Sequence, residues 1–253
     1  MEAKFEGEIM NIRLNCDMGE SFGIWKMGLD EQIMPYIDMA NLACGFHASD
    51  AVTMSKSVAL AKKYNVTIGA HPAYQDLVGF GRRTILCSLE EIKSIILYQL
   101  GALNAFCKAN STVISYVKPH GALYNDMMKD ENIFKAILSA ISSFDKNIKL
   151  MILSSPKNES YKHIAMLYGI TLLYEVFADR NYNDDGTLVS RMREDAVIHD
   201  ELEVAQRITT LKEKGFIQSV NGNRLFLEVD SLCVHGDNEK ALEFIKLLRK
   251  ALI

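Results

Sequence analysis

The sequence predicts an α/β fold in which seven parallel strands form a single β/α barrel. Short β-branched or apolar runs alternate with longer segments of helical spacing, which is typical of parallel strands joined by crossover helices. The chain has 253 residues, a length that fits one such barrel. Polar, titratable residues follow the predicted strands one after another, as they do at the carboxyl-terminal mouth of barrel enzymes.

Seven short segments have the length and apolar character of strands buried in a parallel sheet. These predicted strands are residues 11–16, 37–44, 66–70, 113–118, 149–154, 171–176 and 229–234. Other, longer segments repeat apolar residues every three or four positions, which predicts helices that pack one face against the sheet. The predicted helices are residues 50–64, 89–109, 131–146, 157–168, 201–214 and 238–251.

Local signals mark the ends of several elements. Ser88 and Glu91 have the spacing of a capping box, which predicts the start of a helix. Ser155 followed by Pro156 predicts an N-cap with proline at the first helical position. Within residues 216–229, an Asn-Gly pair separates two apolar runs and predicts a hairpin with a tight primed turn.

The charge balance and the cysteine pattern exclude several classes of protein. Lys and Arg number 28 against 32 Asp and Glu, a net charge of −4 without a long run of one sign, so we expect a small-molecule substrate and no nucleic acid. No stretch approaches the roughly 20 apolar residues of a membrane helix, and the N-terminus lacks a signal-peptide pattern. Five cysteines without a CxxC pair favour a reducing cytoplasm.

A single domain is expected, since no repeat, low-complexity tract or Pro/Gly/Ser-rich linker divides the chain. Residues 1–9 show no clear period, and we interpret them as an N-terminal extension, loose or dispensable. Residues 10–253 then form one β/α-barrel domain that carries the candidate site.

Polar residues follow each predicted strand where it ends. In chain order they are Asn15, Asp17 and Glu20, then His47 and Asp50, His71, Lys118 and His120, Ser154 and Ser155, Glu175, Asp179 and Arg180, and His235 and Asp237. Taken singly, each has an ordinary explanation, because an Asp can cap a helix and a His can be a packing residue. Taken together, four of the six histidines at one end of the strands indicate an active site.

Two segments predict contacts with anions or carbonyl groups. Residues 69–83 combine His71, Asp76 and Arg82 with three glycines, which suits a loop that brings amides and guanidinium groups to a phosphate or carboxylate. The alternative is a surface turn with a solvated Arg pair. Lys118 lies two residues before His120, so both can point into the barrel mouth. Arg180 with Arg191 is a second candidate for anion binding.

A metal site is an open alternative at this stage. Asp17, His47 and His71 can supply a mixed nitrogen and oxygen site, with His235 as a replacement ligand. A hydrogen-bonded acid/base cluster needs the same residues, and no HExxH motif decides between the two. The strand positions of Cys16, Cys44 and Cys233 predict the buried apolar role common for free cysteine.

Six ordered motifs closely resemble those of one known family. They are LNCDMGE (14–20), ANLACGFHASD (40–50), GAHPAYQDLVGFGRR (69–83), VKPHGALYN (117–125), EVFADRNYNDDGTLVSR (175–191) and CVHGD (233–237). The sequence is similar to the LamB/YcsF family of ATP-hydrolysing 5-oxoprolinase A subunits. The departures, ASD for AGD and HPAYQD for HPSYPD, remove no titratable group.

The resemblance implies a seven-stranded barrel of the glycoside hydrolase/deacetylase type, a variant of the TIM barrel. It also implies an enzyme that opens 5-oxoproline to L-glutamate while ATP, with Mg²⁺, is hydrolysed to ADP and phosphate, and that acts together with subunits B and C. The catalytic residues it implies are Asp17, His47, His71, Lys118, His120 and His235. The residues it implies for binding substrate or phosphate are Asn15, Glu20, Asp50, Asp76, Arg82, Asp179, Arg191 and Asp237.

Two other functions fit the same residues. The first is a metal-dependent deacetylase or amidohydrolase that acts on a small acylated substrate without ATP. The second is a substrate-binding subunit without catalytic activity of its own. Metal content and nucleotide dependence separate the first from 5-oxoprolinase, and acid/base substitutions that affect only binding identify the second.

Overall fold

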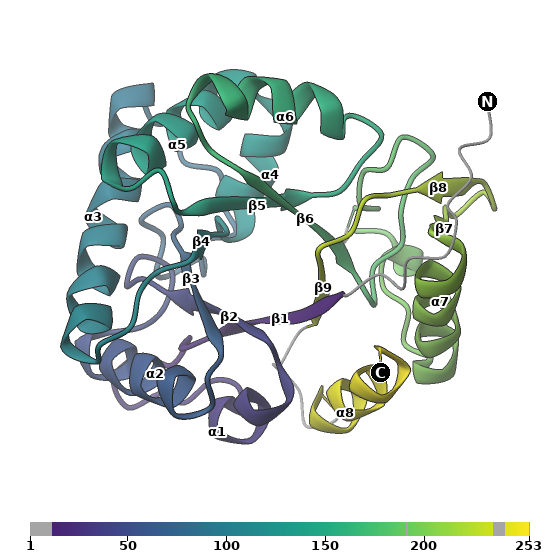
Figure 1. The fold of residues 1–253 in the computed structure, drawn as a ribbon, viewed down its shortest axis with the longest axis horizontal. Coiled ribbons are helices and arrows are strands. Elements are labelled where there is room, and N and C mark those ends of the chain that lie inside the picture. Colours follow the sequence, from purple (N-terminus) through teal and green to yellow (C-terminus); the bar gives the residue numbers. More distant parts are fainter. Residues whose placement is uncertain (1–11, 191, 235–240, 253) are drawn as a thin grey trace.

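The computed structural model describes residues 12–190, 192–234 and 241–252. Seven parallel strands close into a barrel in the order β1-β2-β3-β4-β5-β6-β9, seen end-on in Figure 1. The strands are β1 (Arg13–Met18), β2 (Met39–Ala43), β3 (Thr67–His71), β4 (Tyr116–Val117), β5 (Lys149–Leu153), β6 (Leu172–Phe177) and β9 (Ser231–Val234). The predicted fold class is therefore confirmed. The expected extension at residues 1–9 lies outside the described residues.

The helices lie around the outside of the barrel, as Figure 1 shows. Those that the sequence predicted are α2 (Ala51–Lys63), α3 (Leu89–Ala109), α5 (Glu131–Phe144), α6 (Asn158–Leu167), α7 (Glu201–Lys214) and α8 (Ala241–Leu252). Those that it did not predict are α1 (Asp30–Ile33), η1 (Met34–Tyr36), α4 (Gly121–Lys129) and η2 (Glu194–Ala196). Helix α4 escaped prediction because it starts at a glycine directly after a strand end, where no N-cap side chain marks it.

The local signals had mixed outcomes. Ser88 and Glu91 form the predicted reciprocal capping box at the start of α3. The prediction at Ser155 was wrong by two residues, because α6 starts at Asn158 with Lys157 as its N-cap. The Ser155 hydroxyl instead accepts from the Lys157 backbone N–H in a turn before the helix.

The hairpin exists, but the predicted tight primed turn was wrong. Strands β7 (Phe216–Gln218) and β8 (Arg224–Phe226) pair antiparallel. The Ser219 N–H donates to the Asn223 carbonyl, so the loop spans residues 220–222, and Gly222 takes a φ of 81°. A residue of positive φ at the end of the loop matches a three-residue hairpin rather than a primed two-residue turn.

Alternation along the strands divides the molecule into an apolar shell and a polar barrel interior. One cluster of buried apolar residues lies between strands and helices, and a small separate cluster consists of Met39, Tyr116, Met151 and Leu173. Side chains on a strand alternate between its two faces. On β6, the inward position two residues after Leu173 is the polar Glu175. On β1, Asn15 pairs with Met39, and both Asn15 and Asp17 are polar inward positions.

The barrel interior leaves no room for a side chain at Gly69. A Cβ atom at this position would overlap the ring of Tyr116 on the neighbouring strand β4. The Tyr116 hydroxyl donates to Asn41 at 2.6 Å, so the ring cannot move without loss of a buried hydrogen bond.

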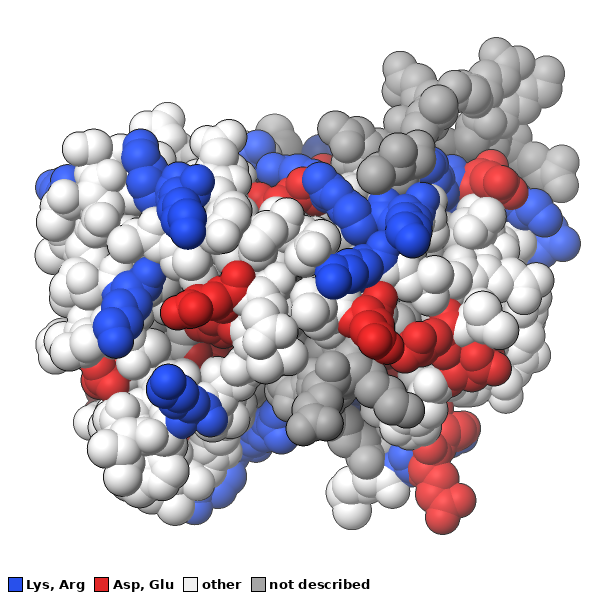
Figure 2. All heavy atoms as spheres, turned by 90° about the horizontal axis from the view of Figure 1, so that it is seen from below, with Lys and Arg blue, Asp and Glu red and all other residues white. Residues whose placement is uncertain are grey.

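The charged side chains on one face of the molecule have no dominant sign. On the face seen in Figure 2, basic and acidic residues are interspersed, in keeping with the small net charge of −4. Among the described residues, no helix is long and apolar enough to cross a membrane.

We predict that Gly69→Ala destabilises the protein by about 1–3 kcal/mol, because the added methyl group overpacks the barrel interior against Tyr116. Urea unfolding measures the change. The control is Gly101→Ala on the exposed side of α3, where an added Cβ meets nothing within 4 Å and helix propensity makes the change stabilising. Equal stability of Gly69→Ala and wild type would contradict the tight fit.

Candidate active site

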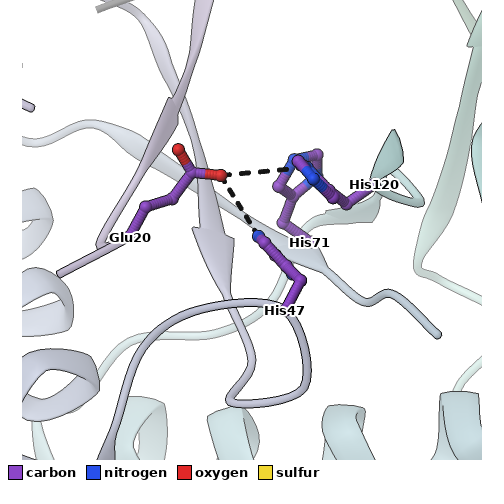
Figure 3. Close-up of side chains that lie close together, drawn as sticks. All are labelled: Glu20, His47, His71 and His120. Carbon is purple, nitrogen blue, oxygen red and sulfur yellow. Dashed lines mark hydrogen bonds and ion pairs between the residues drawn. The ribbon is translucent and has the colours of Figure 1, made fainter. Parts of the chain in front are cut away.

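The site lies at the carboxyl ends of the first four strands. Asp17 is on β1 and His71 ends β3, whereas His47, His120 and Glu20 lie on the segments that follow β2, β4 and β1. Because parallel strands in a barrel present these ends to one face, residues distant in sequence converge. Figure 3 shows the Glu20 carboxylate pointing toward both His47 and His120.

The convergent groups are within contact distance of one another. His47 Nε2 is 3.1 Å and His120 Nδ1 is 3.8 Å from Glu20 Oε1. His120 Nδ1 lies 2.9 Å from His71 Nε2, and His71 Nε2 lies 3.3 Å from Asp17 Oδ2. The sequence thus predicted correctly that these residues belong together, including Glu20, to which it assigned a binding role.

Burial lowers the pKa of two of the imidazoles, those of His47 and His120. His47 and His120 stack face to face, with ring centroids 3.8 Å apart. Burial, together with the neighbouring histidines, holds the pKa of His120 far below its usual range, and burial also lowers the pKa of His47. For Asp17, burial acts to raise the pKa, but the interactions with His71 and with the ammonium group of Lys118 outweigh it and lower the pKa. Asp17 is therefore held as an ionised carboxylate.

Lys118 lies beneath this group as a buried ammonium ion. Its Nζ is 2.9 Å from Glu175 Oε2, 3.4 Å from Asp17 Oδ1 and 3.2 Å from Cys233 Sγ. Burial acts to lower the pKa of Lys118, but Asp17, Cys233 and Glu175 outweigh it and raise the pKa. The amine remains charged because two carboxylates flank it.

An amide network holds the two carboxylates in place. The Asn15 side chain donates to Glu175 Oε2 and accepts from Lys118, and Asn41 donates to both Asn15 and Asp17. Tyr116 donates to Asn41 in turn. Asn15 therefore belongs to the network that supports Asp17 and Lys118. A substrate could contact the Asn15 side chain only by replacing one of its present hydrogen bonds.

The loop after β3 holds the His120 ring in place through a backbone carbonyl group. The Phe80 carbonyl accepts from His120 Nε2 at 2.9 Å, and the Gly81 carbonyl accepts from the Ala122 N–H. A Cβ at Gly81 would come within 2.8 Å of both His120 and His47, so only glycine permits this approach.

Asp76 and Arg82 have separate positions in this loop. Asp76 forms an ion pair with Arg83 and accepts from the Gly79 N–H, so its carboxylate shapes the loop. Arg82 is exposed, with its guanidinium carbon 5.2 Å from the centre of the Phe80 ring. Unlike Asp76, Arg82 is therefore accessible to a ligand from solvent.

Other predicted residues lie away from the cluster or outside the described residues. Asp50 caps α2 through the Val52 and Thr53 N–H groups and also accepts from Gly23. The Asp179 carbonyl accepts from Ile198, and Arg180 donates to two backbone carbonyls, those of Ala196 and Val189. The predictions for Arg191, His235 and Asp237 fall on residues that the structure does not describe.

Sequence reasoning missed several members of the network. Asn41 and Tyr116 received no role, although each faces the barrel interior, and Cys233 was assigned a purely apolar role that its contact with Lys118 corrects. The two-residue alternation along the strands could have indicated that these side chains point into the barrel. In the structure, Cys233 pairs in register with the inward-pointing Asn15 on the neighbouring strand.

A metal ion also fits this arrangement. Glu20, His47, His71 and His120 each offer one ligand atom, and these four atoms lie within 4.8 Å of one another. The sequence suggested Asp17, His47 and His71, so the structure retains the two histidines and adds His120, with Glu20 as the carboxylate of the group.

The six motifs that carry these residues belong to a region with known relatives. The model of the LamB/YcsF family matches residues 12–253. The chain belongs to the LamB/YcsF family. It is 51% identical over 95% of its length to a protein of Vibrio parahaemolyticus that is named as the A subunit of 5-oxoprolinase, of which the match covers 95%. A protein of the same name from Pyrococcus abyssi is 50% identical, with 96% of this chain and 94% of that protein covered.

The fold has a counterpart among solved structures. The crystal structure of a lactam utilization protein from Thermus thermophilus superimposes with a TM-score of 0.89 at 38% sequence identity, and the match covers 96% of each chain. The similarity thus extends over nearly the whole chain that forms the barrel.

We predict that Lys118→Met destabilises the protein by about 3–5 kcal/mol, because Asp17 and Glu175 then lack their buried counter-charge. Combining it with Glu175→Gln should cost less than the sum of the two single changes, since one orphaned charge disappears. Urea unfolding of the four proteins measures this. Strict additivity would show that Lys118 and Glu175 are not coupled.

We also predict a pH dependence that arises from Asp30, whose Oδ2 accepts from the Gly19 N–H next to Glu20. Burial raises the pKa of Asp30 from 3.8 to about 6. A raised carboxyl pKa means that the folded state holds the proton more tightly, so the contribution to stability is complete below pH 3.8 and is lost as pH rises through about 6.

The Asp30→Asn variant cannot lose this proton, so its free energy of unfolding relative to wild type should rise by up to about 3 kcal/mol between pH 4 and pH 7. Denaturation at several pH values measures the difference. The subtraction removes all groups that titrate alike in both proteins. A difference that stays constant with pH would contradict the raised pKa.

Proposed function

We propose that the chain is the A subunit of a 5-oxoprolinase, which opens 5-oxoproline to L-glutamate while ATP is hydrolysed to ADP and phosphate. The observation that carries the proposal is the group of partly exposed Asp17, buried Lys118 and three buried histidines at the barrel mouth. This group lies within a chain that is about half identical, over nearly its whole length, to proteins named as the A subunit of 5-oxoprolinase.

The reaction explains the need for both acid/base and cationic groups. Water must attack the lactam carbonyl carbon, the C–N bond of the ring must break, and the leaving nitrogen must gain a proton. An unstrained five-membered lactam resists this attack. Transfer of the γ-phosphoryl group of ATP to the amide oxygen gives a carbon that water attacks readily. Cleavage of the ring C–N bond then leaves an acyl phosphate, which a second water molecule hydrolyses to the carboxylate and phosphate.

The residues of the site suit these steps. Asp17, held ionised beside His71, is placed to take a proton from the attacking water and to pass one to the leaving nitrogen. The ammonium group of Lys118 helps to keep Asp17 ionised. The exposed Arg82 is placed to meet the substrate carboxylate or a phosphate at the mouth of the barrel. His47 and His120 contact Glu20, so His71 is the imidazole that contacts Asp17 and orients its carboxylate.

Partners and location follow from the same proposal. The relatives are named as one subunit of 5-oxoprolinase, which supports the presence of further chains in the enzyme. In the proposal, these chains are subunits B and C. ATP with Mg²⁺ is then bound with their participation. All five cysteines are free thiols, which supports a cytoplasmic location. Residues 10–253 act as one catalytic domain in this complex.

The decisive experiment reconstitutes the chain with its candidate subunits B and C and measures ADP and glutamate release that depends on 5-oxoproline. Asp17→Asn should lower turnover at least 100-fold, because the amide cannot accept a proton. The control is Asp145→Asn, an exposed aspartate just before β5, at the opposite end of the barrel. It should retain wild-type turnover.

Each alternative has its own outcome in this assay. Release of an acyl group without any need for ATP would replace the proposal with a metal-dependent deacetylase or amidohydrolase. Turnover by Asp17→Asn equal to wild type at saturating 5-oxoproline would leave the chain with a substrate-binding role only. Absence of 5-oxoproline-dependent ADP release from the wild-type assembly would reject the proposed activity.

A further inference from the structure

The hydrogen bonds of His71 fix which of its ring nitrogens carries a proton. Its Nδ1 is 2.7 Å from the Lys118 carbonyl oxygen. A carbonyl oxygen can only accept, so Nδ1 must be the N–H donor. In the neutral imidazole, Nε2 therefore has no proton and directs a lone pair into the site.

His120 is fixed in the same way but in the opposite orientation. Its Nε2 donates to the Phe80 carbonyl oxygen at 2.9 Å, so its Nδ1 is the unprotonated nitrogen of the neutral ring. The two unprotonated nitrogens, His120 Nδ1 and His71 Nε2, face each other at 2.9 Å. Two lone pairs that point at each other repel, and a cation that both can share removes the repulsion.

Two further groups complete the arrangement. Glu20 Oε1 and His47 Nε2 are the remaining ligand atoms, and all four lie within 4.8 Å of one another. With metal–nitrogen bonds of about 2.0–2.1 Å, tetrahedral neighbours are about 3.3 Å apart. Three of the observed separations, 2.9, 3.1 and 3.8 Å, lie on either side of this value. Because the rings of His47 and His120 stack nearly parallel, one of them must turn to direct its nitrogen at a shared ion.

The surroundings resemble the outer shell of a metal site. Metal-bound histidines commonly donate their second ring N–H to a carbonyl or carboxylate, which fixes both tautomer and ring orientation. Both His71 and His120 do so to backbone carbonyls. One belongs to Lys118, directly after β4, and the other to Phe80, in the loop whose Gly81 permits the close approach.

We propose that Glu20, His47, His71 and His120 bind one divalent first-row transition metal ion of the zinc type. Three imidazoles with one carboxylate favour such ions over Mg²⁺, which prefers oxygen ligands. This ion is resident in the chain and separate from the Mg²⁺ that accompanies ATP. When bound, it supplies a Lewis acid next to Asp17. The assignment depends on ligand geometry and not on the proposed substrate.

Metal titration of the purified chain tests this site without any assay of activity. After removal of metal with a chelator, calorimetry with Zn²⁺ and with Co²⁺ should give one ion per chain. His71→Gln and His120→Gln should each weaken binding at least 10-fold. The control is His163→Gln on the exposed side of α6, which should bind as wild type does.

A second measurement on the wild-type protein holds even if the variants fail to fold. Bound Co²⁺ should give a visible absorption spectrum of low coordination number, distinct from that of the hydrated ion, and millimolar Mg²⁺ should not abolish it. Absence of one-to-one binding, equal binding by the His71 and His120 variants, or displacement by Mg²⁺ would overturn the proposal. The facing nitrogens would then share a proton instead.

Discussion

The ammonium group of Lys118 is the centre on which the inside of this barrel depends. A charge taken out of water is costly unless opposite charges and hydrogen bonds surround it. Asp17, Glu175 and Asn15 provide them from two other strands. Strands distant in sequence are thus tied together through one side chain, and the same contact helps to keep Asp17 ionised.

This constraint explains why the barrel interior is unlike an apolar core. Below the ammonium group, Met39, Tyr116, Met151 and Leu173 form a small apolar cluster that closes the interior. Tyr116 links the two levels, because its ring belongs to the apolar cluster and its hydroxyl donates to Asn41. The carboxylate of Asp17 is therefore held by layers of neighbours that leave it little freedom, which is the preorganisation that acid/base chemistry needs.

Backbone carbonyl groups fix the ring orientation of two of the histidines. His71 and His120 each donate to a carbonyl, one at a strand end and one in the loop after β3. Lys118 thus serves the site twice, with its ammonium group toward Asp17 and its carbonyl toward His71. The proposed lactam chemistry and the proposed metal ion both use this shared framework, but they can fail independently, since binding of an ion is measured without substrate.

The sequence by itself determined the seven barrel strands, six of the helices around them and the convergence of Asp17, His47, His71 and His120, because periodicity and position at strand ends are local properties. It did not determine that Asp50 and Asp76 serve as a helix cap and a loop anchor, since free carboxylates and capping carboxylates look alike in one dimension. Nor did it reveal Asn41, Tyr116 or the Cys233 contact with Lys118. Those depend on barrel closure and on the register between strands, which decide which inward positions share a level. The choice between a proton and a metal ion at the histidines likewise rests on which ring nitrogen meets which carbonyl, and only the tertiary structure sets that.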